Sequence, residues 1–180
     1  MSKIVLLTGS PRKLGNSRRM ADSFEKAAAA LGHSVIRYDA AELKISGCRA
    51  CNCCYTGGKP CALDEGYNEI AAELEKADAI VIATPVYWYS YPAQLKSLMD
   101  HWYSLCYAGK SFAGKKAALI ACCEDDSIEA FSGMTMSFRT SMELLEAEVV
   151  GEVLIQNVHK LGDIDRTDGL ARAAGLASLF

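Results

Sequence analysis

Apolar residues gather in short runs along the chain, and longer segments with a helical period separate these runs. Four runs stand out: KIVLLTG from Lys3, ADAIVIATP from Ala77, KKAALIACC from Lys115 and VVGEVLIQNV from Val149. The first three are nearly continuous, which is typical of parallel strands that are covered on both faces. A weaker run, HSVIRYD from His33, predicts a fifth strand.

The segments between these runs predict helices over residues 17–31, 67–76, 92–103 and 128–146, and a last one from 165 onward. The pattern over 92–103 is the clearest, because Pro92 suits the first helical position and one face is apolar: Leu95, Leu98, Met99 and Trp102. Strand and helix alternate five times, which predicts an open, doubly wound α/β sheet. The length predicts one domain over residues 1–180, with an irregular insert at 47–66.

Composition and charge narrow the possible functions. Hydrophobic residues make up 51% of the chain and the formal net charge is −3, so neither nucleic acid nor a membrane surface is expected as a partner. The apolar run Ile4–Leu7 is too short for a signal peptide, and no run is long enough to cross a bilayer. We therefore expect a cytoplasmic protein, in which eight cysteines favour metal or redox chemistry over disulfides.

The segment LLTGSPRKLGNS joins the first strand to the first helix and predicts a phosphate site. Such a turn lies at the carboxyl edge of a doubly wound sheet, where ligands bind. The loop contains two glycines for tight turns, two serine hydroxyls, and Asn16 or Ser17 as a cap for a helix whose N-terminus attracts anions. Its spacing matches neither a Walker loop nor a dinucleotide fingerprint, and the alternative is an ordinary strand-to-helix turn.

A second loop, TPVYWYSYPAQLKSLMDHWY, follows the third strand and is rich in aromatic residues. Tyr87, Trp88, Tyr89 and Tyr91 would lie at the carboxyl edge, where a packing role is less natural than in the core. In a 2-1-3-4-5 strand order this loop lies beside the phosphate loop, across the switch point of the sheet. A phosphate cradle next to an aromatic platform suits a ligand with a phosphate tail and a planar ring system.

These two loops, and the cysteine stretch between them, resemble the flavodoxin-like NAD(P)H-dependent FMN reductases, in particular their iron–sulfur flavoprotein branch. The resemblance runs from about Lys3 to His101 and implies a flavodoxin-like, doubly wound, five-stranded parallel sheet of order 2-1-3-4-5. It implies that the FMN phosphate is held by Ser10, Arg12, Asn16 and Ser17. It also implies that the isoalloxazine ring is lined, with backbone N–H groups facing its polar edge, by Pro85, Val86, Tyr87, Trp88, Tyr89 and Ser90.

The stretch GCRACNCCYTGGKPCALDEG holds five of the eight cysteines. Its C-x2-C-x2-C spacing, with a fourth cysteine after six intervening residues, lets thiolates converge on one cluster, as in bacterial ferredoxins. The ligands of a [4Fe–4S] cluster would then be Cys48, Cys51, Cys54 and Cys61, with Cys53 as a bystander. Zinc and a thioredoxin-like dithiol fit this spacing less well, whereas reduced, metal-free cysteines remain a full alternative.

No catalytic triad or carboxylate pair emerges, so the chemistry is expected to come from the cofactor. The three histidines are interpreted as structural or surface residues, and Asp126 or Ser127 as the cap of the helix that follows ACCEDDS. The leading hypothesis is an FMN-dependent oxidoreductase that passes electrons from NADPH or NADH to a flavin, quinone or other small acceptor. The alternatives are an iron–sulfur flavoprotein that carries electrons between redox proteins, and a thiol- or metal-sensing module. A homo-oligomer is expected.

Overall fold

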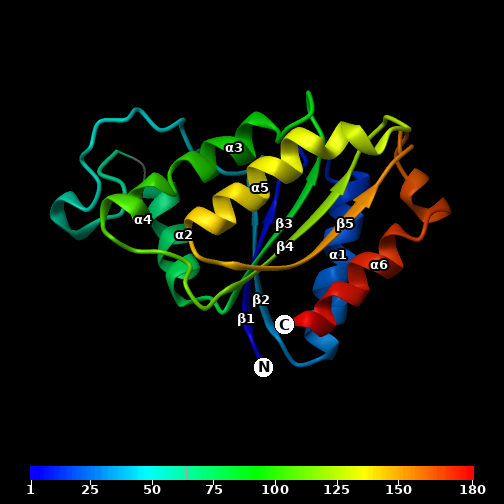
Figure 1. Cartoon of the computed structure of the whole chain (residues 1–180), viewed down its shortest axis with the longest axis horizontal. Helices are drawn as coiled ribbons and strands as arrows, with labels where there is room; N and C mark the ends of the chain where they lie inside the picture. Colours follow the sequence, from blue (N-terminus) through cyan, green and yellow to red (C-terminus); the bar gives the residue numbers. More distant parts are fainter. Residues whose placement is uncertain (64) are drawn as a thin grey trace.

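The computed structural model describes residues 1–63 and 65–180 and contains a five-stranded parallel sheet of order β2-β1-β3-β4-β5 (Figure 1). The predicted strand order is therefore confirmed. The strands are β1 Lys3–Thr8, β2 Ser34–Asp39, β3 Ala79–Pro85, β4 Lys116–Cys122 and β5 Glu148–Ile155. All five run in one direction, so their carboxyl ends meet at the same edge of the sheet.

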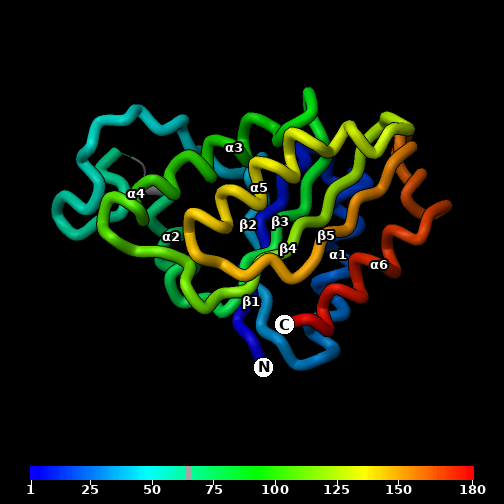
Figure 2. Tube along the Cα trace, in the orientation of Figure 1, coloured from blue at the N-terminus to red at the C-terminus, as the bar shows by residue number. Residues whose placement is uncertain are grey.

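Helices cover both faces of the sheet, as the nearly continuous apolar runs predict. In β1, Ile4 and Leu6 pack on the face covered by α1 and α6, whereas Val5 and Leu7 pack on the opposite face. That opposite face is covered by α2, α3, α4 and α5, and the tube in Figure 2 shows the two helical layers flanking the strands. The helices are α1 Asn16–Ala30, α2 Glu65–Lys76, α3 Ala93–Asp100, α4 Tyr103–Tyr107, α5 Ser132–Leu144 and α6 Gly169–Gly175.

Short 3₁₀ turns complete the chain: η1 Thr56–Gly58, η2 Ile128–Phe131, η3 Asp163–Arg166 and η4 Leu176–Leu179. The prediction of a single helix over 92–103 was wrong, because α3 ends at Asp100 and α4 begins at Tyr103. At the junction, the amides of His101 and Trp102 donate to the carbonyls three residues back, which tightens the helix into a 3₁₀ turn. Pro92 precedes α3 as its N-cap instead of occupying the first helical position.

Two parts of the structure contain the residues that are predicted from the sequence to bind cofactors. The loops after β1, β3, β4 and β5 meet at the carboxyl edge of the sheet, at the top in Figure 1. The segment between β2 and α2, residues 40–63, contains only the η1 turn and extends beyond the end of the sheet beside α4. No helix in the described residues is long and apolar enough to cross a membrane.

Candidate functional site

The loop after β1 is held close to the sheet by two glycines. The Gly9 amide donates to the Ala83 carbonyl at 2.9 Å, and a Cβ at Gly9 would lie 2.4 Å from Thr84 Oγ1. A Cβ at Gly15 would lie 2.6 Å from Ser10 Oγ. Any larger residue at Gly15 would therefore fill the hollow of the loop, which we call the phosphate cradle (residues 9–18).

The cradle opens α1 with free backbone amides. Gly15 is the N-cap, so the prediction that Asn16 or Ser17 caps the helix was wrong. The first intrahelical hydrogen bond runs from the Arg19 amide to the Gly15 carbonyl at 3.0 Å. The amides of residues 16–18 therefore have no acceptor within the helix, and such groups bind anions well.

Ser17 adds an unsatisfied hydroxyl to this helix end. Its Oγ atom is buried and has no hydrogen-bond partner in the described part of the chain. The hydroxyl and the amide of Ser17 lie near the Cys122 sulfur and would donate to it if it were a thiolate. However, burial and the adjacent Cys123 raise the pKa of Cys122 to about 12. Cys122 therefore stays a neutral thiol, which is a poor acceptor, and an anion at the helix terminus would satisfy the Ser17 hydroxyl better.

The other predicted phosphate ligands differ in whether their side chains already have hydrogen-bond or ion-pair partners. The Asn16 side chain is engaged, because its amide nitrogen donates to the Lys160 carbonyl at 2.8 Å and its oxygen accepts from the Gly162 amide at 3.0 Å. Asn16 therefore keeps its backbone amide and the second N–H of its side-chain amide as donors for an anion. The Arg12 guanidinium is exposed and pairs with no carboxylate in residues 1–63 and 65–180, whereas Arg18 pairs with Asp39 at 2.6 Å.

The tertiary structure brings the predicted phosphate loop and the start of the aromatic loop to one cavity of about 130 Å³. This cavity is lined by Ser10, Arg12, Gly15, Asn16, Ser17, Pro85, Val86, Tyr87, Cys122, Cys123, Glu124, Val158 and His159. All four predicted phosphate ligands and three of the six predicted ring-lining residues are therefore adjacent. The orphaned Ser17 hydroxyl and the glycine-lined hollow fit a terminal phosphate such as that of FMN.

The aromatic loop forms a tight two-residue hairpin. Tyr87 and Ser90 exchange backbone hydrogen bonds of 2.9 and 3.0 Å, while Trp88 and Tyr89 at the tip both adopt positive φ angles of 50° and 61°. Two bulky residues in the left-handed region cost free energy, and such strain concentrates at functional sites. The hairpin rests on α5, where a Cβ at Gly133 would lie 2.7 Å from the Tyr89 carbonyl oxygen.

The hairpin presents its two tip side chains to solvent and to a second, open groove. Trp88 is 95% exposed and Tyr89 58% exposed, and both border a groove of about 600 Å³ that continues from Val86. Ser90 closes the hairpin and borders neither cavity. Tyr91 is a core residue, contrary to the prediction, because its ring is buried and its hydroxyl donates to the Met134 carbonyl.

The backbone of the hairpin offers fewer free N–H groups than the resemblance implies. The Val86 amide donates to the Cys122 carbonyl at 2.9 Å, and the amides of Tyr87 and Ser90 are used within the hairpin. The amides of Trp88 and Tyr89 have no acceptor among the described residues. Only these two tip amides could therefore face the polar edge of a bound ring.

Sequence reasoning missed the contribution of the loop after β5. His159 lies 3.2 Å from Glu124 and 3.2 Å from Asn157 Oδ1, and His159 and Glu124 border both the phosphate cavity and the open groove. No motif marks this histidine, although its position just beyond a strand end at the carboxyl edge was a usable signal. Of the two predicted caps, Asp126 and Ser127, it is Ser127 that caps the η2 turn before α5, since its hydroxyl accepts from the Glu129 amide.

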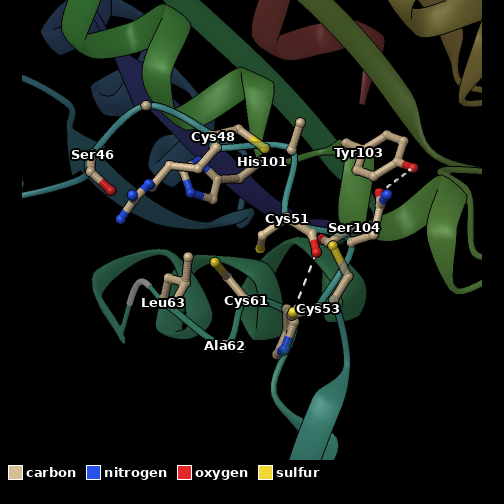
Figure 3. A pocket seen from close by; sticks show the side chains of 16 residues that line it. Ser46, Cys48, Cys51, Cys53, Cys61, Ala62, Leu63, His101, Tyr103 and Ser104 are labelled. Atoms are coloured by element: carbon tan, nitrogen blue, oxygen red, sulfur yellow. Dashed lines mark hydrogen bonds between the residues drawn. The ribbon is translucent and has the colours of Figure 1, made fainter.

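The cysteine loop, residues 46–63, surrounds a separate small cavity of about 30 Å³ (Figure 3). The cavity is lined by Cys48, Cys51, Cys53, Cys54 and Cys61 together with His101 and Ser104. Burial raises the pKa of the Cys54 thiol, and its neighbours Cys48, Cys61 and Cys51 raise it further. The four predicted ligands are thus near one another. No group of three or more His, Cys, Asp or Glu side chains is poised to hold a metal ion within the described ranges.

Side chains from two helices, α2 and α4, anchor this loop. Asn68 of α2 clamps Cys61 from both sides, since it accepts from the Cys61 amide at 2.7 Å and donates to the Cys61 carbonyl at 2.8 Å. The Tyr103 hydroxyl of α4 donates to Asn52 at 3.1 Å. Tyr55, next to Cys54, donates to Glu75 at 2.7 Å. These contacts hold the middle and the C-terminal part of the loop at fixed places.

The loop backbone also suits an anionic group. Ala50, Asn52 and Tyr55 have positive φ angles of 50°, 55° and 58°, although none is glycine. Left-handed residues interspersed in a loop turn successive N–H groups toward one side, and such nests are found at phosphate and iron–sulfur sites. The donor chemistry and the backbone are of the kind found at iron–sulfur sites, although the thiols of the described residues are not gathered around a metal position. The thiolate ligands of a [4Fe–4S] cluster would be Cys48, Cys51, Cys54 and Cys61.

Comparison with known proteins places these two sites in a family. The family model for NADPH-dependent FMN reductases matches residues 2–159. The chain belongs to this family. The matched region contains the phosphate cradle, the cysteine loop, the hairpin and the first part of the loop after β5, up to His159.

Curated relatives in the family carry the name iron–sulfur flavoprotein. One from Archaeoglobus fulgidus is 34% identical over 98 residues, which are 54% of this chain and 44% of the relative. One from Methanosarcina thermophila is 34% identical over 113 residues, which are 63% of this chain and 58% of the relative. The matches thus span about half the length of these relatives.

Solved structures confirm the fold. The NAD(P)H:quinone oxidoreductase from Methanothermobacter marburgensis superposes with a TM-score of 0.76 at 22% identity, over 98% of this chain and 94% of that chain. An azoreductase from Bacillus anthracis superposes with a TM-score of 0.71 at 20% identity, over the full length of both chains. At these identities the likeness establishes the flavodoxin-like architecture.

Proposed function

We propose that this chain is an FMN-dependent oxidoreductase that takes electrons from NADPH or NADH and passes them to a quinone, a flavin or another small acceptor. The observation that carries the proposal is the buried, unpartnered Ser17 hydroxyl at a helix end with free amides, in one cavity with the start of the hairpin. FMN, when bound, would accept the hydride and release the electrons. The protein has to bind it, orient it and shape the space beside it.

The residues that would bind FMN and a second planar molecule line two neighbouring cavities. Ser10, Ser17 and the amides of residues 16–18 would bind the phosphate, with the exposed Arg12 adding a weaker, salt-screened attraction. The backbone of residues 85–87 would run along the ring, and the Trp88 and Tyr89 amides are the donors left for its polar edge. The open groove beside Trp88 and Tyr89 has room for a second planar molecule.

Purification and titration test this proposal directly. The protein should bind FMN with a 1:1 stoichiometry, and NADPH or NADH should bleach the bound flavin until a quinone reoxidises it. Ser17→Ala should weaken FMN binding, whereas Ser178→Ala, a serine at the far end of the chain whose hydroxyl donates to the Gly175 carbonyl, is the matched control. A protein that stays colourless and fails to bind added FMN would contradict the proposal.

We further propose that the cysteine loop holds a [4Fe–4S] cluster, which would supply one-electron transfer. The thiol donor set, the left-handed residues of the loop and the name shared by the curated relatives support it. If the cluster is present, the second candidate function is that of an electron carrier between redox proteins. Reduction of its bound flavin by NADPH or NADH would be slow. Rapid bleaching of the flavin by a nicotinamide nucleotide decides for the reductase.

Iron and sulfide analysis under anaerobic conditions tests the cluster. About four irons per chain are expected, and Cys51→Ser should lose them while it keeps FMN. Cys106→Ser is the matched control, because Cys106 is an exposed cysteine outside the loop. Absence of iron after anaerobic reconstitution would leave a flavoprotein with metal-free cysteines.

The proposed setting is the cytoplasm, and the proposed assembly is a homo-oligomer. Exposed aromatic side chains near the hairpin and on α4, including Trp88, Tyr103 and Tyr107, form apolar surface that a second copy could cover. Sedimentation at micromolar concentration should show a dimer or larger species. A single monomeric species would contradict this part of the proposal.

A further inference from the structure

One cysteine of the loop has no place in the proposed cluster. Cys53 lies between two predicted ligands, and both it and Cys51 are exposed. The Cys53 thiol donates to the Cys51 carbonyl at 3.3 Å, so its side chain folds back along the chain toward residue 51 (Figure 3).

The backbone between these cysteines brings them together. Asn52 has a φ of 55°, and the Tyr103 hydroxyl holds its side chain at 3.1 Å. A left-handed residue bends the chain, so its two neighbours lie closer than they would in an extended strand. A disulfide requires Cα atoms roughly 4.4–6.8 Å apart and side chains that face each other. In the C-x-C segment the Cys53 thiol already points back to the carbonyl of Cys51, and the bend at Asn52 favours a short Cα separation.

We propose that Cys51 and Cys53 form a reversible disulfide when the loop carries no cluster, and that this disulfide blocks cluster assembly. The oxidant is a low-molecular-weight disulfide such as oxidised glutathione. One thiolate attacks the external disulfide and forms a mixed disulfide, releasing one thiol. The second thiolate then attacks the mixed disulfide, which forms the Cys51–Cys53 bond and releases the second external thiol. Two protein thiols are oxidised and one external disulfide is reduced.

Competing pairs within the loop are less favourable. Cys54 is half-buried and adjacent to Cys53 in the chain, where a disulfide would need a strained ring. Cys61 is held at its backbone by Asn68, which fixes it on the side of α2. The disulfide itself requires neither iron nor flavin. Its consequence for the cluster rests on the proposed function, because the disulfide would remove Cys51 from the ligand set.

Thiol counting on iron-free protein tests the disulfide. The fully reduced chain has eight thiols, and equilibration with oxidised glutathione followed by removal of the small molecules should remove two of them. The tryptic peptide that begins at Ala50 should contain a link between Cys51 and Cys53. Cys53→Ser and Cys51→Ser should each lose no thiols at the same glutathione ratio, whereas Cys106→Ser should lose two. Loss of two thiols from Cys53→Ser, or a link to another cysteine, would overturn the proposal.

Cobalt(II) then tests whether the disulfide blocks metal binding. The absorbance of cobalt bound to thiolates reports binding to the loop, and the assay needs no added reductant. Reduced wild type and Cys53→Ser should bind cobalt, and wild type treated with oxidised glutathione should not until dithiothreitol is added. Equal binding by oxidised and reduced wild type would overturn the block. If reduced wild type fails to bind cobalt at all, the proposed ligand set is wrong, while the thiol count still decides the disulfide.

Discussion

The phosphate cradle and the cysteine loop are built in opposite ways. The cradle is held by the sheet itself, since the Gly9 amide bonds to β3 and the hollow is too close to Ser10 Oγ for a side chain at Gly15. The cysteine loop has only one 3₁₀ turn and is held by side chains that reach in from α2 and α4, such as Asn68 and Tyr103. A site made of backbone is expected to be preformed, whereas a site made of side-chain anchors can rearrange around what it binds.

This contrast predicts that changes in one region leave the other intact. The largest effect is expected for Gly15→Val, which would place side-chain atoms against Ser10 Oγ and the Arg12 carbonyl. Overpacking costs roughly 1–3 kcal/mol, and here it also blocks the cradle, so FMN affinity should fall by about 100-fold or more. Flavin fluorescence titration measures this loss. The reactivity of the loop thiols should not change, and a variant that alters both would contradict the independence of the two regions.

The reverse change is Asn68→Asp, which removes the donor to the Cys61 carbonyl but keeps the acceptor for its amide. Supporting residues of this kind are worth about 10–100-fold in metal affinity. We expect faster iron release during chelator challenge and unchanged FMN affinity. Lys76→Ala, an exposed position near the end of the same helix, is the control. Iron release at the wild-type rate from Asn68→Asp would show that the clamp does not position Cys61.

Ser17→Ala tests the role of Ser17 in the cradle, because its expected effects on the free energy of unfolding and on FMN affinity have opposite signs. The hydroxyl is unpartnered in the free protein, so its removal should not lower the free energy of unfolding and should raise it slightly. The same change should weaken FMN binding by about 10-fold, because a hydrogen bond to a charged group contributes about 1.5 kcal/mol or more. Urea unfolding of the flavin-free protein and FMN titration measure the two effects. A loss of stability without a loss of affinity would contradict the assigned role.

The smallest effect is expected at the hairpin. Replacing Trp88 with Asn and Tyr89 with Gly puts the residues that this turn prefers at both left-handed positions. Relief of strain should raise the free energy of unfolding by about 1 kcal/mol, because a left-handed conformation costs roughly 1–2 kcal/mol per ordinary residue. The double variant Trp88→Ala/Tyr89→Ala is the control, since it removes the aromatic rings and keeps both Cβ atoms. An equal gain in the control would show that strain is not the cause.

The sequence alone determined the α/β architecture and the loops that contain the candidate ligand-binding residues. Continuous apolar runs reveal strands buried on both faces, because burial leaves a local trace in each segment. Since parallel strands end at one edge, the order of strands and helices along the chain places the loops LLTGSPRKLGNS and TPVYWYSYPAQ at that edge. Their side-by-side position followed from the 2-1-3-4-5 strand order that the family resemblance implied, and both line one cavity. The cysteine spacing likewise pointed to a thiol site, and all four predicted ligands line one cavity.

Only the tertiary structure decided which of these groups are free to act. The Asn16 side chain is hydrogen-bonded to residues 160–164, and such partners, more than 140 positions away in the chain, leave no local pattern. The burial of Tyr91 and the position of His159 beside Glu124 likewise depend on contacts between distant segments. Local periodicity records how deeply a segment is buried, whereas the pairing of one polar group with another depends on contacts that form only when the whole chain has folded.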